Sequence, residues 1–162
     1  MTVRPAGDAD LDPILALWNG FIRDTTVTFT SEEKTAAGLA AMIAERRAAG
    51  REFLVAEADG DFAGFATYAQ FRGGNGYAHA MEHSIMLAPR ARGRGIGRSL
   101  MRAIEDHARA GGAHTLFAGV SGENPAGVDF HDRLGFATIV RIPEVGRKFD
   151  RWLDLVLMMK RL

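Results

Sequence analysis

The fold is decided by the stretch Pro89-Arg90-Ala91-Arg92-Gly93-Arg94-Gly95-Ile96-Gly97-Arg98-Ser99-Leu100. Before it, residues 80–87 alternate as a strand does, and after it residues 96–110 repeat apolar side chains at helical spacing. Free N–H groups at the start of a helix form an anion site, and glycines let an anion approach them closely. The arginines add positive charge that matches a pyrophosphate. The stretch therefore predicts a strand–turn–helix unit with a phosphate site, although a glycine-rich turn with solvated arginines also fits the pattern.

Known motifs can be compared with this stretch and its surroundings letter by letter. The dinucleotide pattern G-x-G-x-x-G fails because, counted from Gly93 and Gly95, its last glycine falls on Arg98. The Walker pattern fails because Gly97-Arg98-Ser99 lacks the lysine. The nucleophile elbow G-x-S-x-G is only half present, in residues 119–123. The pattern that matches is R-x-x-G-x-G, formed by Arg92, Gly95 and Gly97.

The rest of the chain alternates between strand and helix patterns, which predicts a single mixed α/β domain with at least one βαβ crossover. Asp59-Gly60 lies between two alternating runs and is a strong hairpin signal. The predicted strands are residues 2–4, 53–57, 62–68, 80–87, 115–120, 137–142 and 153–159, with a brief extended piece at 27–29. The predicted helices begin near Asp8 to Asp10, at Ser31 or Glu32, at Gly95 or Ile96, and at Asn124, and the second ends at Ala49.

Charge and composition exclude several classes of protein. The chain has 20 basic and 20 acidic residues, and this balance argues against a nucleic-acid partner. It contains no cysteine, so disulfides, thiolate metal sites and covalent cysteine catalysis are excluded. The sequence contains no apolar run of the length of a membrane span, and its N-terminus lacks the apolar core of a signal peptide. We therefore expect a cytoplasmic protein without a membrane partner.

With the motif at Arg92, Gly95 and Gly97, the chain resembles the GNAT superfamily of N-acetyltransferases, in which this turn holds the pyrophosphate of coenzyme A. Asn124 and residues 130–136 resemble the later helix of that family, which packs beside the pantetheine arm. The resemblance implies an α/β (α+β) fold over residues 1–162, with a mixed, mostly antiparallel sheet of about seven strands and about four helices. It implies acetyl-CoA as co-substrate, bound by Met86, Leu87, Arg92, Gly93, Arg94, Gly95, Ile96, Gly97, Arg98 and Asn124.

Other segments resemble one branch of that superfamily, the phosphinothricin and methionine sulfoximine or sulfone N-acetyltransferases. The chain departs from the branch at Tyr77-Ala78, where an aromatic residue followed by arginine is common. An arginine at that position could hold a substrate carboxylate, and this chain lacks it. The matching segments are residues 18–19, 25–29, 71–72, 82–84, 130–131, 145–149 and 151–154.

Glu82 is the candidate general base, because in a strand it shares one face with Ser84 and Met86 while His83 points elsewhere. A carboxylate removes a proton from an ammonium only if burial raises its pKa or water relays the proton. A carboxylate paired with an arginine is the alternative reading. The oxyanion donor is expected to be main-chain N–H near Met86 or Leu87.

His131 is the second catalytic candidate, because an imidazole can protonate the departing thiolate or donate a hydrogen bond to it. A partly buried structural histidine is the alternative. Arg72 is a candidate clamp for a substrate carboxylate, or else a solvated arginine. The histidines have no spacing typical of a metal site, so no metal is expected. The other candidate acceptor residues are Phe29, Phe71 and Tyr77.

The sequence therefore predicts an acetyl-CoA-dependent N-acetyltransferase acting on a small amino-acid-like amine by direct transfer in a ternary complex. Two alternatives remain. The acceptor can be another amine, such as a polyamine, an antibiotic or a protein amine, or the chain can be a non-catalytic acyl-CoA sensor. The apolar residues Phe149, Trp152, Leu155 and Leu157 suggest a strand face that the resemblance places in a homodimer, although a monomer core explains them equally.

Overall fold

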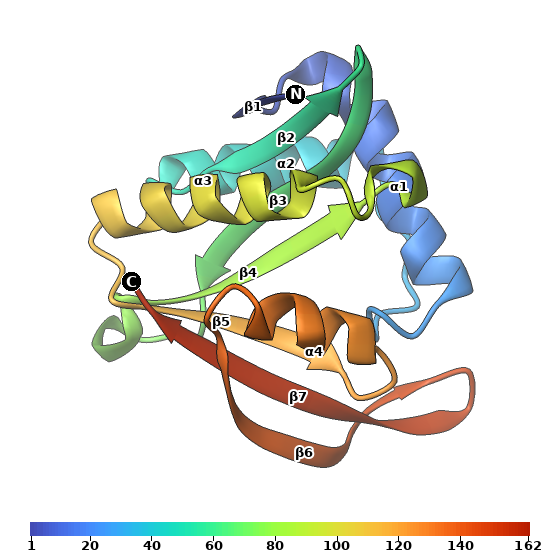
Figure 1. Cartoon of the computed structure of the whole chain (residues 1–162), viewed down its shortest axis with the longest axis vertical. Helices are drawn as coiled ribbons and strands as arrows, with labels where there is room; N and C mark the ends of the chain where they lie inside the picture. The colour runs from blue at the N-terminus through green and yellow to red at the C-terminus, as the bar shows by residue number, and fades with distance from the viewer.

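A seven-stranded sheet in the order β1-β2-β3-β4-β5-β7-β6 forms the centre of the computed structural model, which describes residues 1–162 (Figure 1). All neighbouring strands are antiparallel except β4 and β5. The mixed, mostly antiparallel sheet expected from the sequence is confirmed. The strands are β1 (Thr2–Pro5), β2 (Phe53–Ala58), β3 (Asp61–Gln70), β4 (Ala80–Leu87), β5 (Thr115–Ser121), β6 (Ala137–Lys148) and β7 (Arg151–Arg161).

Four helices cover the two faces of the sheet, as Figure 1 shows. On one face lie α1 (Leu11–Asp24) and α2 (Ala36–Ala48), and on the other lie α3 (Ile96–Ala110) and α4 (Pro125–Asp132). The alternation of side chains along the strands produces two separate cores. The core under α1 and α2 contains Trp18, Phe53 and Phe65, and the core under α3 contains Leu100 and Leu116.

The segment between α1 and α2 differs from its prediction. The expected helix start at Ser31 or Glu32 is wrong, because α2 begins at Ala36. The side chain of Asn19 makes hydrogen bonds to both backbone groups of Lys34, with distances of 2.9 and 2.8 Å, and keeps this segment out of the helix. Thr35 then caps the helix by accepting the Gly38 N–H at 3.1 Å. The extended piece expected at residues 27–29 does not form a strand, and residues 26–28 are bends.

The C-terminal hairpin is longer than predicted. The strand expected to end at residue 142 continues to Lys148, and its partner begins at Arg151 rather than at residue 153. The pairing of β6 with β7 shifts register between Thr138 and Val140 and again between Ile142 and Gly146. These irregularities let one strand pass through a segment whose sequence lacks regular alternation.

The feature that creates the site is the divergence of the two parallel strands. β4 and β5 are paired only through residues 80–82 and 115–117, after which β4 continues to Leu87 paired with β3 but no longer with β5. In Figure 1 the two strands run together near the C-terminus and separate toward α4. Main-chain groups on that side of β4 are therefore left without a strand partner. None of the four helices is long and apolar enough to span a membrane.

Candidate active site

Two connected clefts occupy the space that the diverging strands leave. We call the first the strand cleft, with a volume of about 250 Å³, and the second the turn cleft, with a volume of about 570 Å³. Both are lined by Val27, Ile85, Met86, Asn124 and His131, so they join there. The strand cleft also includes Trp18, Thr28, Phe29, Glu82, His83, Ser84, residues 118–121 and Leu155. The turn cleft also includes Phe21, Leu87, Ala91, Arg92, Gly93, Gly95, Gly97, Arg98, Ala126, Gly127, Phe130, Arg133 and Leu134.

The turn cleft is bounded by the glycine-rich stretch before α3. Gly93 and Gly95 have φ of 71° and 78°, a left-handed conformation that residues with a Cβ rarely adopt. No atom lies within 4 Å of a Cβ built on either glycine, so the backbone is open to an approaching group. The helix begins at Ile96, and the N–H groups of its first turn have no partners within the helix. The stretch therefore presents unpaired donors at an open, positively polarised helix start.

Only some of the arginines in the glycine-rich stretch before α3 line the turn cleft. Arg92 and Arg98 line it, and their charges complement an anion there. Arg94 instead donates to Asp59 at 2.6 Å, in the turn between β2 and β3. The side chain of Ile96 is 2% exposed and belongs to the core. Of the residues expected to bind the coenzyme, Arg94 and Ile96 are therefore absent from the cleft lining.

Glu82 lies in the strand cleft, at the last residue of β4 that still pairs with β5. It is half-buried, and burial raises the pKa of its carboxyl group. Glu82 makes none of the ion pairs in the structure, so no lysine or arginine nitrogen lies within 4.0 Å of its carboxylate oxygens. The alternative of a carboxylate paired with an arginine is therefore excluded. A raised pKa and a free carboxylate suit a group that accepts protons near neutral pH.

The main chain of β4 provides hydrogen-bond donors to the cleft. At one end of the β3–β4 pair the carbonyl of Ala80 accepts from the N–H of Phe71, and at the other end the N–H of Ala88 donates to the carbonyl of Ala63. The register between these two hydrogen bonds is unbroken. Even-numbered residues of β4 therefore direct their N–H groups toward β3, and odd-numbered residues direct theirs toward the opening beside β5. The donors that face the cleft thus belong to Ile85 and Leu87. The N–H of Met86 points to β3, so of the two residues expected to provide the oxyanion donor only Leu87 directs its N–H to the cleft.

His131 is held in one tautomer by its own helix. Its Nδ1 lies 2.7 Å from the carbonyl oxygen of Gly127, and because a carbonyl only accepts, Nδ1 carries the proton. Burial lowers the pKa of the ring, so the imidazole is neutral near pH 7. Nε2 is then an acceptor, and it has no partner in the protein. The donor role suggested by the sequence does not fit the neutral ring, which must first take up a proton at Nε2.

His83 was expected from strand alternation to point away from the side chain of Glu82. It lines the strand cleft, and its ring centroid lies 5.0 Å from that of His131. Neither ring nitrogen has a hydrogen-bond partner, and burial lowers the pKa of the ring to about 3. Strand alternation correctly puts His83 on the face opposite Glu82. The cleft, however, is a gap in the sheet itself, so side chains of both faces line it.

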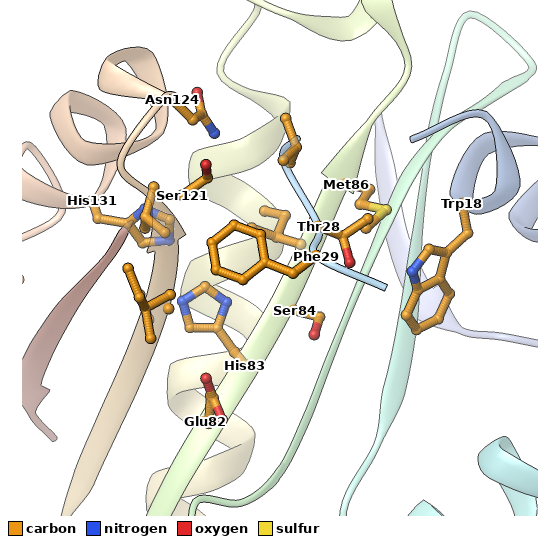
Figure 2. Close-up of a pocket in the computed structure, with 16 residues that line it drawn as sticks. Trp18, Thr28, Phe29, Glu82, His83, Ser84, Met86, Ser121, Asn124 and His131 are labelled. Carbon is orange, nitrogen blue, oxygen red and sulfur yellow. The ribbon is translucent and has the colours of Figure 1, made fainter. Parts of the chain in front are cut away.

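The expected acceptor residues are only partly brought together. Figure 2 shows Phe29 in the middle of the view, with Trp18 on one side and His131 on the other. Phe71, Arg72 and Tyr77 do not line the strand cleft: Phe71 stacks on Phe117 at 4.1 Å, and the guanidinium of Arg72 lies 5.4 Å from the ring centre of Tyr77. Their part in acceptor binding stays a prediction.

Comparison with known proteins assigns this constellation to a family. A family model described as acetyltransferase (GNAT) family matches residues 14–136. The chain belongs to the GNAT family. It is 35% identical to an L-amino acid N-acyltransferase, MnaT, of Escherichia coli, covering 100% of this chain and 94% of that protein. It is 37% identical to an L-methionine sulfoximine/L-methionine sulfone acetyltransferase of Pseudomonas aeruginosa, covering 99% and 94%.

A solved GNAT structure supports the same assignment for the fold and the co-substrate. A phosphinothricin acetyltransferase from Sinorhizobium meliloti, in complex with acetyl-CoA, superposes with a TM-score of 0.94 at 30% identity, covering 99% of this chain and 88% of that one. The turn cleft of this GNAT chain fits a coenzyme A pyrophosphate, because Gly93 and Gly95 leave the backbone open and Arg92 and Arg98 add charge. Acetyl-CoA is the co-substrate of this enzyme. The structure contains no cluster of three or more His, Asp or Glu side chains that could hold a metal ion.

Proposed function

We propose that this chain transfers the acetyl group of acetyl-CoA to the amino group of a small amino-acid-like substrate of the methionine sulfoximine, methionine sulfone or phosphinothricin type. The observation that carries the proposal is the free, half-buried carboxylate of Glu82 in a cleft that joins the turn cleft. The acceptor class is supported by the names of relatives that are 33–37% identical over nearly the whole chain. The strand cleft, at about 250 Å³, suits an acceptor of that size.

The chain's own groups supply the proton transfers and the charge stabilisation. Bound acetyl-CoA supplies an acetyl group activated as a thioester. Glu82 accepts a proton from the substrate ammonium, directly or through water, and frees the lone pair that forms the N–C bond. The N–H groups of Ile85 and Leu87 donate to the carbonyl oxygen as negative charge develops on it. Nε2 of His131 accepts the second proton of that nitrogen and, as imidazolium, donates it to the sulfur as the C–S bond breaks.

Two other functions make different predictions for a simple assay. The purified protein is incubated with acetyl-CoA and a panel of amines, and the release of free thiol is followed. Turnover of methionine sulfone, methionine sulfoximine or phosphinothricin supports the proposal. Turnover of polyamines, antibiotics or protein amines alone assigns a different acceptor. Tight binding of acetyl-CoA without turnover of any amine indicates a sensor rather than an enzyme.

Replacing Glu82 tests the proton route. We expect Glu82→Gln to lower kcat by more than about tenfold near neutral pH, because the amide cannot accept a proton. The affinity for acetyl-CoA, measured by calorimetry, should stay nearly unchanged, because Glu82 does not line the turn cleft. Glu45→Gln, an exposed change on α2, is the control and should behave as wild type. A wild-type rate in Glu82→Gln would remove this residue from the mechanism.

We also propose that the enzyme is a homodimer formed through the hairpin of β6 and β7. Five large apolar side chains on the strands and turn of this hairpin are 43–58% exposed, and we refer to them together as its apolar surface: Ile139, Val140, Val145, Phe149 and Trp152. Of the face expected from the sequence, Phe149 and Trp152 belong to this surface, whereas Leu155 lines the strand cleft. A cytoplasmic location and the lack of a nucleic-acid or membrane partner stay predictions.

A further inference from the structure

Lys148, the last residue of β6, is buried without an acidic partner. Its residue is 4% exposed, and its ammonium donates to the carbonyl oxygens of Thr25 at 2.6 Å and Thr28 at 2.8 Å. It makes none of the ion pairs in the structure. A buried cation is costly unless it makes hydrogen bonds, and here two main-chain carbonyls accept from two of its three N–H groups. This arrangement ties residues 25–28 to a strand that is about 120 residues later in the chain.

Phe29 belongs to the same loop, residues 25–29, and its ring packs against Gly146 of the same strand, β6. A Cβ built on Gly146 would lie 2.2 Å from Cδ2 of Phe29, so only glycine leaves room for the ring. Gly146 follows the register shift in β6 that begins after Ile142. The irregular pairing of β6 therefore places a residue without a side chain beneath Phe29.

A third contact connects the loop to β7 through an acidic residue. The hydroxyl of Thr26 donates to Glu123 at 3.0 Å, and both carboxylate oxygens of Glu123 accept from Arg151, at 2.6 and 3.0 Å. Arg151 is the first residue of β7. These three contacts thus connect the loop to the β6–β7 hairpin, either directly or through Glu123.

The loop needs these contacts because it has no regular structure of its own. Residues 26–28 are bends, and Thr25 is the only one tied back to α1, through its N–H and hydroxyl bonds to the carbonyl of Phe21. Val27, Thr28 and Phe29 nevertheless form one wall of the strand cleft. Lys148 and Gly146, which contact residues of this loop, do not line the cleft themselves.

We propose that Lys148 is a positioning residue that, together with Gly146, holds residues 25–29 in the shape that binds the acceptor, so that the C-terminal hairpin determines which acceptors are used. The inference rests on the proposed function in taking the strand cleft as the acceptor site. It assigns to Lys148 no contact with the acceptor or with the reacting atoms. The geometry of the loop itself can be tested without knowing the acceptor.

The test compares Lys148→Met, which keeps the length of the side chain and removes its donors, with Lys148→Arg and Lys160→Met. Lys160 donates to Glu105 at 2.7 Å, so Lys160→Met also breaks a part-buried lysine contact in the hairpin but does not touch the loop. For each variant the KM of the best acceptor in the amine panel, the KM of acetyl-CoA and the Tm are measured. Hydrogen exchange of residues 25–29 is measured in parallel.

We expect Lys148→Met to raise the acceptor KM and the exchange of residues 25–29 by about tenfold each, the effect of losing one or two hydrogen bonds from a charged donor. The KM of acetyl-CoA and the exchange of α3 should change less than about twofold, and Lys148→Arg should restore part of the acceptor KM. Lys160→Met should lower the Tm without moving the acceptor KM. If Lys148→Met does not fold, Gly146→Ala displaces Phe29 and should give the same pattern.

Two outcomes would overturn the inference. Unchanged exchange of residues 25–29 in Lys148→Met would show that the lysine does not hold the loop. Raised exchange with an unchanged acceptor KM would show that the loop does not position the acceptor. If the amine panel instead yields no substrate, the proposed function fails, while the exchange measurement still decides whether Lys148 holds the loop.

Discussion

The buried imidazole of His83 should make the stability of this protein depend on pH. Burial and, to a lesser extent, the neighbouring His131 lower the pKa of His83 to about 3 in the folded chain, against 6.5 for the free side chain. Between these values the unfolded chain binds a proton at this residue and the folded chain does not. The free energy of unfolding must therefore fall as the pH drops below 6.5, and the loss levels off near pH 3.

The magnitude follows from the two pKa values. At pH 5 the unfolded chain is stabilised by proton binding at His83 by about 2 kcal/mol relative to pH 7.5. For a protein of this size that corresponds to a decrease of about 1 M in the midpoint of urea unfolding. His131, whose pKa burial also lowers, contributes in the same direction. Glu82 contributes in the opposite direction, because its pKa is raised in the folded chain.

The assay is urea unfolding at pH 7.5 and pH 5, followed by circular dichroism, for the wild type and for His83→Leu. The variant removes the titrating ring and two unpartnered nitrogens, while the contributions of His131 and Glu82 are common to both proteins. We expect the loss of stability between the two pH values to be smaller by about 2 kcal/mol in His83→Leu. His114→Gln, at an exposed position, is the control and should keep the wild-type dependence. Equal pH dependence in the wild type and His83→Leu would refute a buried neutral His83.

Two further changes test the coenzyme site and the apolar surface. Gly95→Asp should abolish acetyl-CoA binding in calorimetry, because it adds strain at φ 78° and a negative charge at the anion site. Gly95→Ala adds only the strain and should weaken binding by about tenfold; an unchanged Kd in Gly95→Asp would contradict the site. Trp152→Glu should convert a dimer of 17.6 kDa chains into a monomer in sedimentation velocity, and a monomeric wild type would disprove the proposed dimer.

The fold could be predicted from the sequence where a short segment carries its own structural preference. The hairpin of β2 and β3 was expected from Asp59-Gly60, and both residues have the positive φ that this turn requires, 57° and 86°. The hairpin of β6 and β7 makes the same kind of turn with Phe149-Asp150, at 51° and 57°. Neither residue is a glycine, so the sequence offers no turn signal there. Phe149 adopts a left-handed conformation that is rare for a bulky residue, whereas aspartate adopts it more readily, so only Asp150 favours this turn.

The start of α2 could not be predicted for a similar reason. Ser31 and Glu32 look like a helix start by themselves, whereas the side chain that prevents it, Asn19, lies on the preceding helix. A contact between elements thus overrides a local capping preference. Periodicity within one element carries no information about such a contact.

The turn cleft and the strand cleft also differ in how far each could be predicted from the sequence. The coenzyme half depends on main-chain groups of one continuous stretch, and the chemistry of Gly93, Gly95 and the start of α3 can be read directly from the sequence. The position of Glu82 in the cleft could also be predicted, since strand alternation places its side chain on the opposite face from those of its neighbours. The tautomer of His131 was not, because it depends on the carbonyl of Gly127.

The acceptor half is assembled from segments far apart in the chain, which explains why its specificity is harder to predict than its chemistry. Its walls come from α1, the loop of residues 27–29, β4, β5, α4 and β7. The loop takes its shape from Lys148 and Gly146, which touch no cleft. A change in the β6–β7 hairpin can therefore alter the acceptor while the coenzyme turn and Glu82 stay the same. Enzymes of this fold that share the turn should for this reason differ in acceptor more readily than in co-substrate, with the differences concentrated in the loop and the hairpin that holds it.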